Sequence, residues 1–128
     1  EGIYTLCKRF YSKYKLPIFI TENGIADRND SKRPRYIADH LAYLAKAIDE
    51  GIQVERYYHW TQMDNFEWLD GEHAKFGLYR CDFKTQERTP RNSAGLFAQF
   101  CIKKELTEEM MEEYGLSEQA ADTLINIQ

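Results

Sequence analysis

A short apolar run that stops abruptly at polar residues is the feature that most restricts how this chain can fold. Ile18, Phe19 and Ile20 predict a fully buried strand, which Glu22 and an Asn-Gly pair follow almost at once. Such a strand presents polar side chains at the mouth of a sheet or barrel, and in α/β barrels that mouth carries the catalytic groups. The alternative is a plain strand followed by an ordinary Asn-Gly turn.

A second strand-like run breaks into a segment that mixes carboxylates, amides and aromatic rings. Val54, Tyr57, Tyr58 and Trp60 favour a strand, and residues 61–68 follow it. An indole can pack against the C–H face of a sugar ring, while carboxylates and amides bind its hydroxyl groups. The alternative is that these aromatic side chains only form core under a loop, since aromatic residues mostly serve packing.

Together the two segments resemble glycoside hydrolase family one, the β-glucosidase family of (β/α)8 barrels. The resemblance covers about residues 1–102, with the family's motifs in order and at the family's spacing. The motifs are Ile20–Gly24 (Ile-Thr-Glu-Asn-Gly), His59–Trp68 (His-Trp-Thr-Gln-Met-Asp-Asn-Phe-Glu-Trp), Lys75–Tyr79 (Lys-Phe-Gly-Leu-Tyr) and Asp82–Ser93 (Asp-Phe-Lys-Thr-Gln-Glu-Arg-Thr-Pro-Arg-Asn-Ser). The resemblance implies an α/β fold in which this chain forms the C-terminal part of a (β/α)8 TIM barrel, about its last two strands and their helices.

The chain is much shorter than a whole barrel. Its 128 residues are enough to bury one core, but a (β/α)8 barrel needs about 250 residues. We therefore expect residues 1–102 to be the C-terminal part of a glycosidase barrel, and residues 103–128 to be an acidic helical extension. The sequence does not choose between the tail of a longer protein and a free-standing fragment. The start at Glu1 does not read as a signal peptide.

Hydrophobic spacing predicts alternating helices and strands in the first half of the chain. Residues 17–60 would form a strand–helix–strand unit, which implies parallel strands. The loop Ala26–Arg33 reads as solvated, with its charges at the surface. The expected elements are helices over residues 1–14 and 34–48 and strands over 17–21 and 52–60.

The second half is expected to hold one extended segment and three helices. The extended segment covers Phe76–Phe83. Thr89–Pro90 predict the cap and the first position of a helix that runs through Cys101. Two short acidic helices are expected beyond it, over Glu105–Tyr114 and Ser117–Ile127, packed on the domain or on a neighbouring subunit.

The resemblance also assigns roles to single residues. It implies that Glu22 is the nucleophile of a retaining glycosidase, and that Asn23 orders the loop beside it. Trp60 would be the platform under the sugar ring, and Phe76 an apolar wall. Glu67 would accept hydrogen bonds from two sugar hydroxyls, and the neighbouring indole of Trp68 would donate to a third. The remaining polar residues are expected to be structural: Asp64 and Asn65 hold the loop, and His59 belongs to the barrel wall.

The catalytic pair is incomplete in this sequence. In the family the acid/base lies in an Asn-Glu-Pro motif, which these 128 residues do not contain. The expected function is hydrolysis of neutral β-D-glucosides or galactosides, because Glu67 would repel a sugar 6-phosphate. The alternative is a non-catalytic fragment or descendant that binds carbohydrate or protein.

Composition restricts the partners. The net charge of −4, without a basic cluster, argues against nucleic acid. No apolar run is long enough to cross a membrane, and neither a metal nor a cofactor is expected. The substrate would be a β-linked saccharide, and the chain would pair with copies of itself or with the missing barrel portion. Cys7, Cys81 and Cys101 read as buried reduced thiols, which favours the cytoplasm.

Overall fold

The computed structural model describes residues 1–116. It is an α/β structure with one parallel strand pair, one small antiparallel pair and four α-helices within that range. The elements are α1 (Gly2–Tyr14), β1 (Ile18–Asn23), α2 (Arg33–Asp49), β2 (Val54–His59), the 3-10 helix η1 (Trp68–Asp70), β3 (Tyr79–Cys81), β4 (Arg88–Pro90), α3 (Asn92–Lys103) and α4 (Glu108–Glu113).

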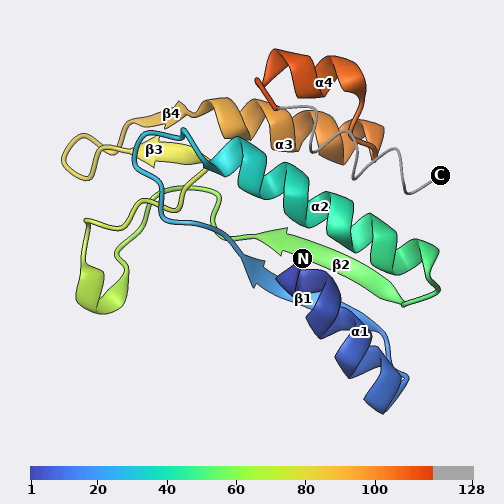
Figure 1. Cartoon of the computed structure of the whole chain (residues 1–128). Coiled ribbons are helices and arrows are strands. Elements are labelled where there is room, and N and C mark those ends of the chain that lie inside the picture. The colour runs from blue at the N-terminus through green and yellow to red at the C-terminus, as the bar shows by residue number, and fades with distance from the viewer. Residues whose placement is uncertain (117–128) are drawn as a thin grey trace.

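The predicted strand–helix–strand unit is confirmed. β1 and β2 are parallel and adjacent, with Ile18 opposite Val54 and Asn23 opposite His59 (Figure 1). Their carboxyl ends therefore lie at the same edge of the sheet. β1 extends to Asn23, so the polar residues that follow the apolar run belong to the strand itself.

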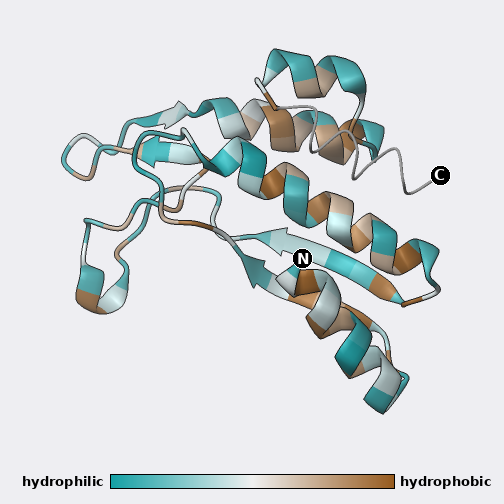
Figure 2. Ribbon diagram, in the orientation of Figure 1, coloured by the Kyte–Doolittle hydropathy of each residue, from teal (hydrophilic) through white to brown (hydrophobic). Residues whose placement is uncertain are grey.

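Helices α1 and α2 cover one face of this pair. The expectation that Ile18–Ile20 form a fully buried strand is wrong for the described residues, because half-buried Ile18 and Ile20 alternate with Phe19, which is 49% exposed. One face of β1 therefore turns toward the helices and the other away from them. Figure 2 shows that apolar residues recur along α2. The core there consists of Cys7, Leu44, Ala47 and Ile52, with Ile18, Ile20, Val54 and Tyr57 packed against it. Burial of these side chains accounts for the position of both helices.

A second core lies between α2 and α3, where Ile37, Leu41, Leu78 and Ala94 are buried. The predicted start of α3 is wrong. Thr89–Pro90 lie in β4, which pairs with β3, and the helix begins at Asn92.

Helix α4 packs on the rest of the chain. Met110 is fully buried and Met111 is 4% exposed, while the hydroxyl of Thr107 caps the helix by accepting from the Met110 amide at 3.3 Å. The sequence placed a longer helix over Glu105–Tyr114, but only Glu108–Glu113 is helical. The helix expected over Ser117–Ile127 lies outside the described residues.

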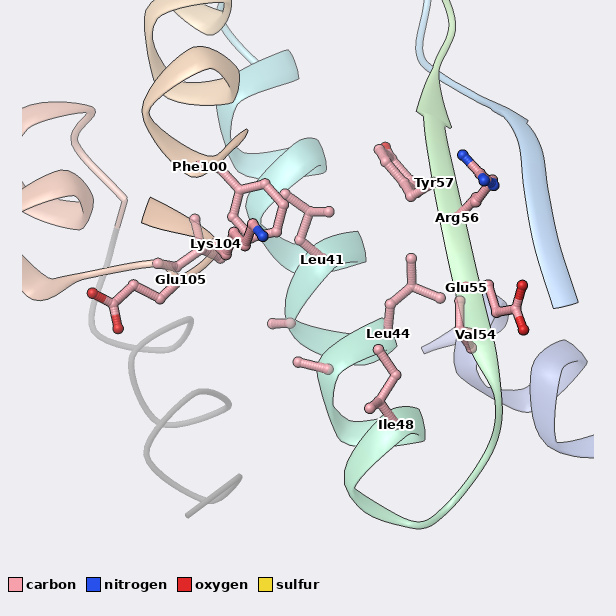
Figure 3. A pocket seen from close by; sticks show the side chains of 13 residues that line it. Leu41, Leu44, Ile48, Val54, Glu55, Arg56, Tyr57, Phe100, Lys104 and Glu105 are labelled. Atoms are coloured by element: carbon pink, nitrogen blue, oxygen red, sulfur yellow. The ribbon is translucent and has the colours of Figure 1, made fainter. Parts of the chain in front are cut away.

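Several apolar surfaces stay open. Within residues 1–116, neither outer edge of the β1–β2 pair meets another strand, and Phe19 and Tyr58 are each 49% exposed. A cavity of about 410 Å³ lies between α2, β2 and the end of α3, where Leu41, Leu44 and Ile48 face β2 (Figure 3). Cys7 and Cys81 are buried as expected, but Cys101 is exposed, which corrects that prediction. Among the described helices none is long and apolar enough to span a membrane.

Candidate active site

Glu22 and Asn23 end strand β1 at the carboxyl edge of the parallel pair. The side chain of Glu22 is exposed there. The side-chain oxygen of Asn23 accepts a hydrogen bond from the Tyr57 hydroxyl at 3.0 Å, and its main-chain oxygen accepts from the Trp60 amide at 2.9 Å. Asn23 thus ties the end of β1 to β2 and to the start of the next loop, which supports the ordering role expected for it.

Gly24 lets the two motifs approach each other. A methyl group at this position would overlap the Trp60 carbonyl oxygen, so only glycine fits against the main chain there. The peptide bond between Trp60 and Thr61 is cis. The motif that begins at Ile20 and the one that begins at His59 therefore meet through main-chain atoms.

Within residues 1–116, a side-chain hydrogen bond joins two of the expected sugar-binding residues, Trp60 and Glu67. The indole N–H of Trp60 donates to Oε1 of Glu67 at 3.1 Å, and both residues are half-buried. The loop is closed just beyond them, where the Glu67 amide donates to the Gly71 carbonyl at 2.8 Å. The bond from the Trp60 indole to Oε1 gives the carboxylate of Glu67 a fixed orientation relative to the indole.

The tip of the same loop is strongly exposed. Trp68 is 88% exposed, and the apolar side chains of Phe66 and Leu69 beside it also face solvent. The alternative that all aromatic residues of this segment form core is thus wrong for Phe66 and Trp68. Trp68 is accessible to an external ligand, and no hydrogen bond joins its side chain to Glu22 or Glu67 in the described part of the chain.

Phe76 reaches the site through the main chain. It is half-buried, and its carbonyl accepts from the Thr61 amide at 3.3 Å. Phe76 consequently lies beside the residue that follows Trp60. Of the sequence-derived site residues, hydrogen bonds link Asn23 with Trp60 and Trp60 with Glu67; Glu22 and Trp68 are placed by their neighbours in the chain.

Asp64 fixes the base of the loop. It is buried, and its carboxylate accepts from both Nη atoms of Arg91, at 3.0 and 2.9 Å, and from the Gly77 amide at 3.0 Å. Burial alone would raise the pKa of Asp64, but the Arg91 guanidinium and the amides hold that pKa below its usual range. The expected structural role of Asp64 is confirmed. Asn65 differs, because its side-chain oxygen is buried without a hydrogen-bond partner.

His59 lies at the end of β2, directly before Trp60. Burial, with a smaller contribution from the positive charge of Arg33, lowers the pKa of His59 to about 4. Its ring packs against Phe97 with 5.7 Å between ring centroids, and neither ring nitrogen has a hydrogen-bond partner. The imidazole is therefore neutral near pH 7 and serves packing, as expected for a wall residue.

The loop Ala26–Arg33 is where sequence reasoning missed important residues. Arg33 is fully buried and pairs with Asp30, so the expectation of surface charges is wrong for these two. Asp27 accepts from the amides of Lys32 and Arg33, at 2.7 and 3.0 Å. A usable signal existed: the lysine at the start of this helix cannot accept a hydrogen bond from the first amides, and the loop before it contains carboxylates that can.

Groups of three or more His, Cys, Asp or Glu side chains arranged for a metal ion are absent from residues 1–116. The chemistry available at this edge of the sheet is that of carboxylates and aromatic rings. Glu22 offers an exposed carboxylate, Trp60 and Glu67 an oriented indole and acceptor, and Trp68 an accessible ring.

Known proteins match this arrangement over most of the chain. The family model described as glycosyl hydrolase family 1 matches residues 1–106. A β-galactosidase of Pyrococcus woesei is 41% identical over 114 residues, which are 88% of this chain and 22% of that protein. A 6-phospho-β-galactosidase of Streptococcus equi subsp. zooepidemicus is 36% identical over 84% of this chain and 25% of its own length.

Solved structures of β-glycosidases are also similar to this chain. The crystal structure of a hyperthermophilic β-glucosidase from Pyrococcus furiosus superposes with a TM-score of 0.84 at 41% identity, over 90% of this chain and 24% of that one. The chain thus spans about a quarter of the length of that protein, or slightly less for the first relative. With a family model that covers nearly all of the described residues, this chain belongs to glycosyl hydrolase family 1.

Proposed function

We propose that this chain supplies the nucleophile and part of the sugar-binding site of a retaining β-glycosidase. The observation that carries the proposal is the hydrogen bond between Trp60 and Glu67, set at the same sheet edge as Glu22. An oriented carboxylate beside an indole suits a sugar ring, and an exposed carboxylate at the end of a parallel strand suits attack on its anomeric carbon.

Glu22 has the role of nucleophile in this proposal. Retaining hydrolysis needs a second carboxyl group about 5–5.5 Å away, which protonates the departing oxygen and later activates water. Glu67 does not take that role, because its carboxylate is engaged by the Trp60 indole. The 128 residues hold no Asn-Glu-Pro motif, so the acid/base comes from chain outside this sequence.

The sugar is held by four residues. Glu67 accepts from two hydroxyl groups, and Trp68 donates its indole N–H to a third. Trp60 forms the platform under the ring, and Phe76 forms the apolar wall beside it. The exposure of Trp68 and the half-burial of the other three support this assignment, since each side chain keeps some surface accessible to a ligand.

The substrate proposed is a neutral β-D-glucoside or galactoside. A carboxylate at position 67 repels a 6-phosphate group. Two of the relatives are described as a β-galactosidase and a β-glucosidase, names that mention no phosphate. The 6-phospho-β-galactosidase among the relatives shows that the family also contains the other specificity, so residue 67 is the point to test.

The two strands are proposed to be the last two of a (β/α)8 barrel. Three features support this. Both outer edges of the β1–β2 pair lack a neighbouring strand in residues 1–116, Phe19 and Tyr58 face away from the helices, and the chain covers only 22% of a relative. The barrel portion outside this sequence would cover these surfaces and bring the acid/base to Glu22.

The decisive experiment replaces Glu22 in the complete protein that carries this chain. Glu22→Gln should reduce hydrolysis of an aryl β-glucoside on the order of 10⁴-fold with the fold intact. Azide should restore turnover to Glu22→Gly, because it attacks the anomeric carbon as the phenol leaves and gives the inverted glycosyl azide. The control Glu55→Gln, an exposed carboxylate on β2, should keep wild-type activity. Equal activity of Glu22→Gln and wild type would refute the assignment.

The isolated 128-residue chain should show no turnover. Measurable hydrolysis by this chain that disappears in Glu22→Gln would contradict the statement that half of the catalytic pair lies elsewhere. A non-catalytic role as a carbohydrate- or protein-binding module is the second candidate, which the missing Asn-Glu-Pro favours only where these 128 residues form the whole protein. It would gain support if the complete protein bound a β-linked saccharide without hydrolysing it.

Specificity is tested by Glu67→Ser in the complete protein. The loss of two charged hydrogen bonds, each worth about 1.5–3 kcal/mol, should lower kcat/KM for a neutral β-glucoside by tens-fold or more. The ratio of kcat/KM values for the neutral and the 6-phosphorylated substrate should fall. If the wild-type protein already prefers the phosphorylated substrate, Glu67 does not face the sugar as proposed.

A further inference from the structure

Arg33, the first residue of α2, is a fully buried arginine. Its guanidinium pairs with the carboxylate of Asp30, and its Nη2 donates to the main-chain oxygens of Asp27 at 2.6 Å and of Lys75 at 2.7 Å. Its Nε is buried without a hydrogen-bond partner. A buried charge that serves a side chain and two carbonyls fixes three segments relative to one another.

Asp30 extends this connection to a fourth segment. Its two carboxylate oxygens accept from the amide and the hydroxyl of Ser93, both at 2.7 Å. Ser93 is fully buried in the first turn of α3. The ion pair therefore joins the loop after β1, the start of α2 and the start of α3.

The connection to Lys75 leads into the sugar site. The carbonyl of Lys75 also accepts from the Asp27 amide at 2.9 Å, and the next residue in the chain is Phe76. The carbonyl of Phe76 in turn accepts from the Thr61 amide. Arg33 thus holds, through main-chain atoms, the segment that carries the apolar wall beside Trp60. The strand end that carries Glu22 is linked to the same loop by the bond from the Trp60 amide to the Asn23 carbonyl, but it has an additional bond to β2, from the Tyr57 hydroxyl to the Asn23 side chain, that does not involve the Phe76 segment.

We propose that Arg33, fixed by Asp30, is a positioning residue that sets the place of Phe76 in the sugar site without touching the sugar. This inference rests on the proposed function. Without the guanidinium, the Lys75 carbonyl loses one of its two donors, and the carboxylate of Asp30 is left buried without its charged partner. The wall then moves, while the nucleophile stays where Asn23 holds it.

This separation predicts a particular kinetic change in the complete protein. Arg33→Met should raise KM for an aryl β-glucoside on the order of tenfold to a hundredfold and change kcat by less than about threefold. A residue with only a structural role would instead reduce the active fraction, which lowers kcat and leaves KM unchanged. The KM of Arg33→Lys should fall between those of the wild type and Arg33→Met. An ammonium group keeps the charge but cannot reproduce the planar fork of donors.

The matched control is Arg35→Met, on the same helix. Arg35 forms a partly exposed ion pair with Asp39 at 2.7 Å and should be replaceable with wild-type KM and kcat. If Arg33→Met matches this control in KM, or lowers kcat at constant KM, the positioning role is refuted.

A second measurement keeps this test separate from the proposed function. Amide hydrogen exchange at Asp27 and Thr61, which donate to the carbonyls of Lys75 and Phe76, should be at least tenfold faster in Arg33→Met than in Arg35→Met. If the wild-type protein has no glycosidase activity, the proposed function fails, and this exchange ratio still decides whether Arg33 holds the segment. Equal protection in the two variants would overturn the inference.

Discussion

The main chain of Trp60 lies directly against Gly24, so closely that a methyl group on Gly24 would overlap the Trp60 carbonyl oxygen. Gly24→Ala should therefore push the two motifs apart and lower the free energy of unfolding by about 1–3 kcal/mol or more. Urea unfolding measures this change. Gly2→Ala is the control, since the space around Gly2 is open, and its effect should stay within about 0.5 kcal/mol. Equal stabilities of the two variants would contradict this contact.

The buried pair of Asp64 and Arg91 should contribute strongly to stability. Asp64→Ala leaves the Arg91 guanidinium without its carboxylate, and should lower the free energy of unfolding by about 3–5 kcal/mol. A double-mutant cycle with Arg91→Ala measures the coupling. The same cycle on the partly exposed pair Arg35 and Asp39 should give about 0–1 kcal/mol. A coupling as small at Asp64 as at Asp39 would contradict the arrangement.

His59 should make stability depend on pH. Its pKa is about 4 in the folded state and 6.5 in the reference state, so between these values the unfolded chain binds a proton that the folded chain does not. Stability should fall as the pH drops from 6.5 to 4, by at most about 1.4 kcal/mol per pH unit from this group. Arg33, Asp30 and the Phe97 ring are the groups facing it.

The matched variant is His59→Gln, which cannot take up the proton. Its free energy of unfolding should depend less steeply on pH between 6.5 and 4 than that of the wild type. Above pH 7 the two slopes should coincide, because His59 is neutral in both states there. Parallel curves across the whole range would show that His59 is protonated equally in the folded and unfolded chains.

Helix α4 should stabilise the chain through Met110. Met110→Ala removes a fully buried side chain and should lower the free energy of unfolding by about 2–5 kcal/mol. Glu112→Ala, on the exposed side of the same helix, should have an effect below about 0.5 kcal/mol. Gly95→Ala tests the packing of α4 against α3 at a second point, since a methyl group there would lie 2.5 Å from the hydroxyl of Tyr114, the residue that follows α4. Wild-type stability of Met110→Ala would mean that α4 does not pack as described.

Much of the framework could be predicted from the sequence, because it depends on local periodicity. The apolar run at Ile18–Ile20 and the 3.6-residue spacing after Pro34 correctly predicted β1, α2 and their parallel partner β2. The start of α3 could not be predicted in this way. Thr89–Pro90 fits a helix start locally, but pairing of Tyr79 with Pro90 keeps these residues in β4, and that pairing is not local.

The burial and the partners of the charged residues could not be predicted from the sequence. Arg33 and Asp30 lie in a polar loop whose composition indicates solvent, and only the folded chain brings the Lys75 carbonyl and Ser93 to them. The bond between Trp60 and Glu67 spans seven residues across an irregular loop, where no period applies. The motifs supplied the candidate site residues, but did not predict which of them would form hydrogen bonds with one another.

The parallel pair also has a consequence for how specificities spread among relatives. The nucleophile candidate Glu22 and the sugar-gripping candidate Glu67 sit at one edge of one strand–helix–strand unit, whose core is built from its own residues and α1. A gene exchange that replaced residues 1–76 as a block would transfer both carboxylates together with Gly24, Asn23 and Tyr57, which hold them in register. The proposed nucleophile and the proposed sugar-binding carboxylate would then be inherited as a single module, whereas the acid/base would not.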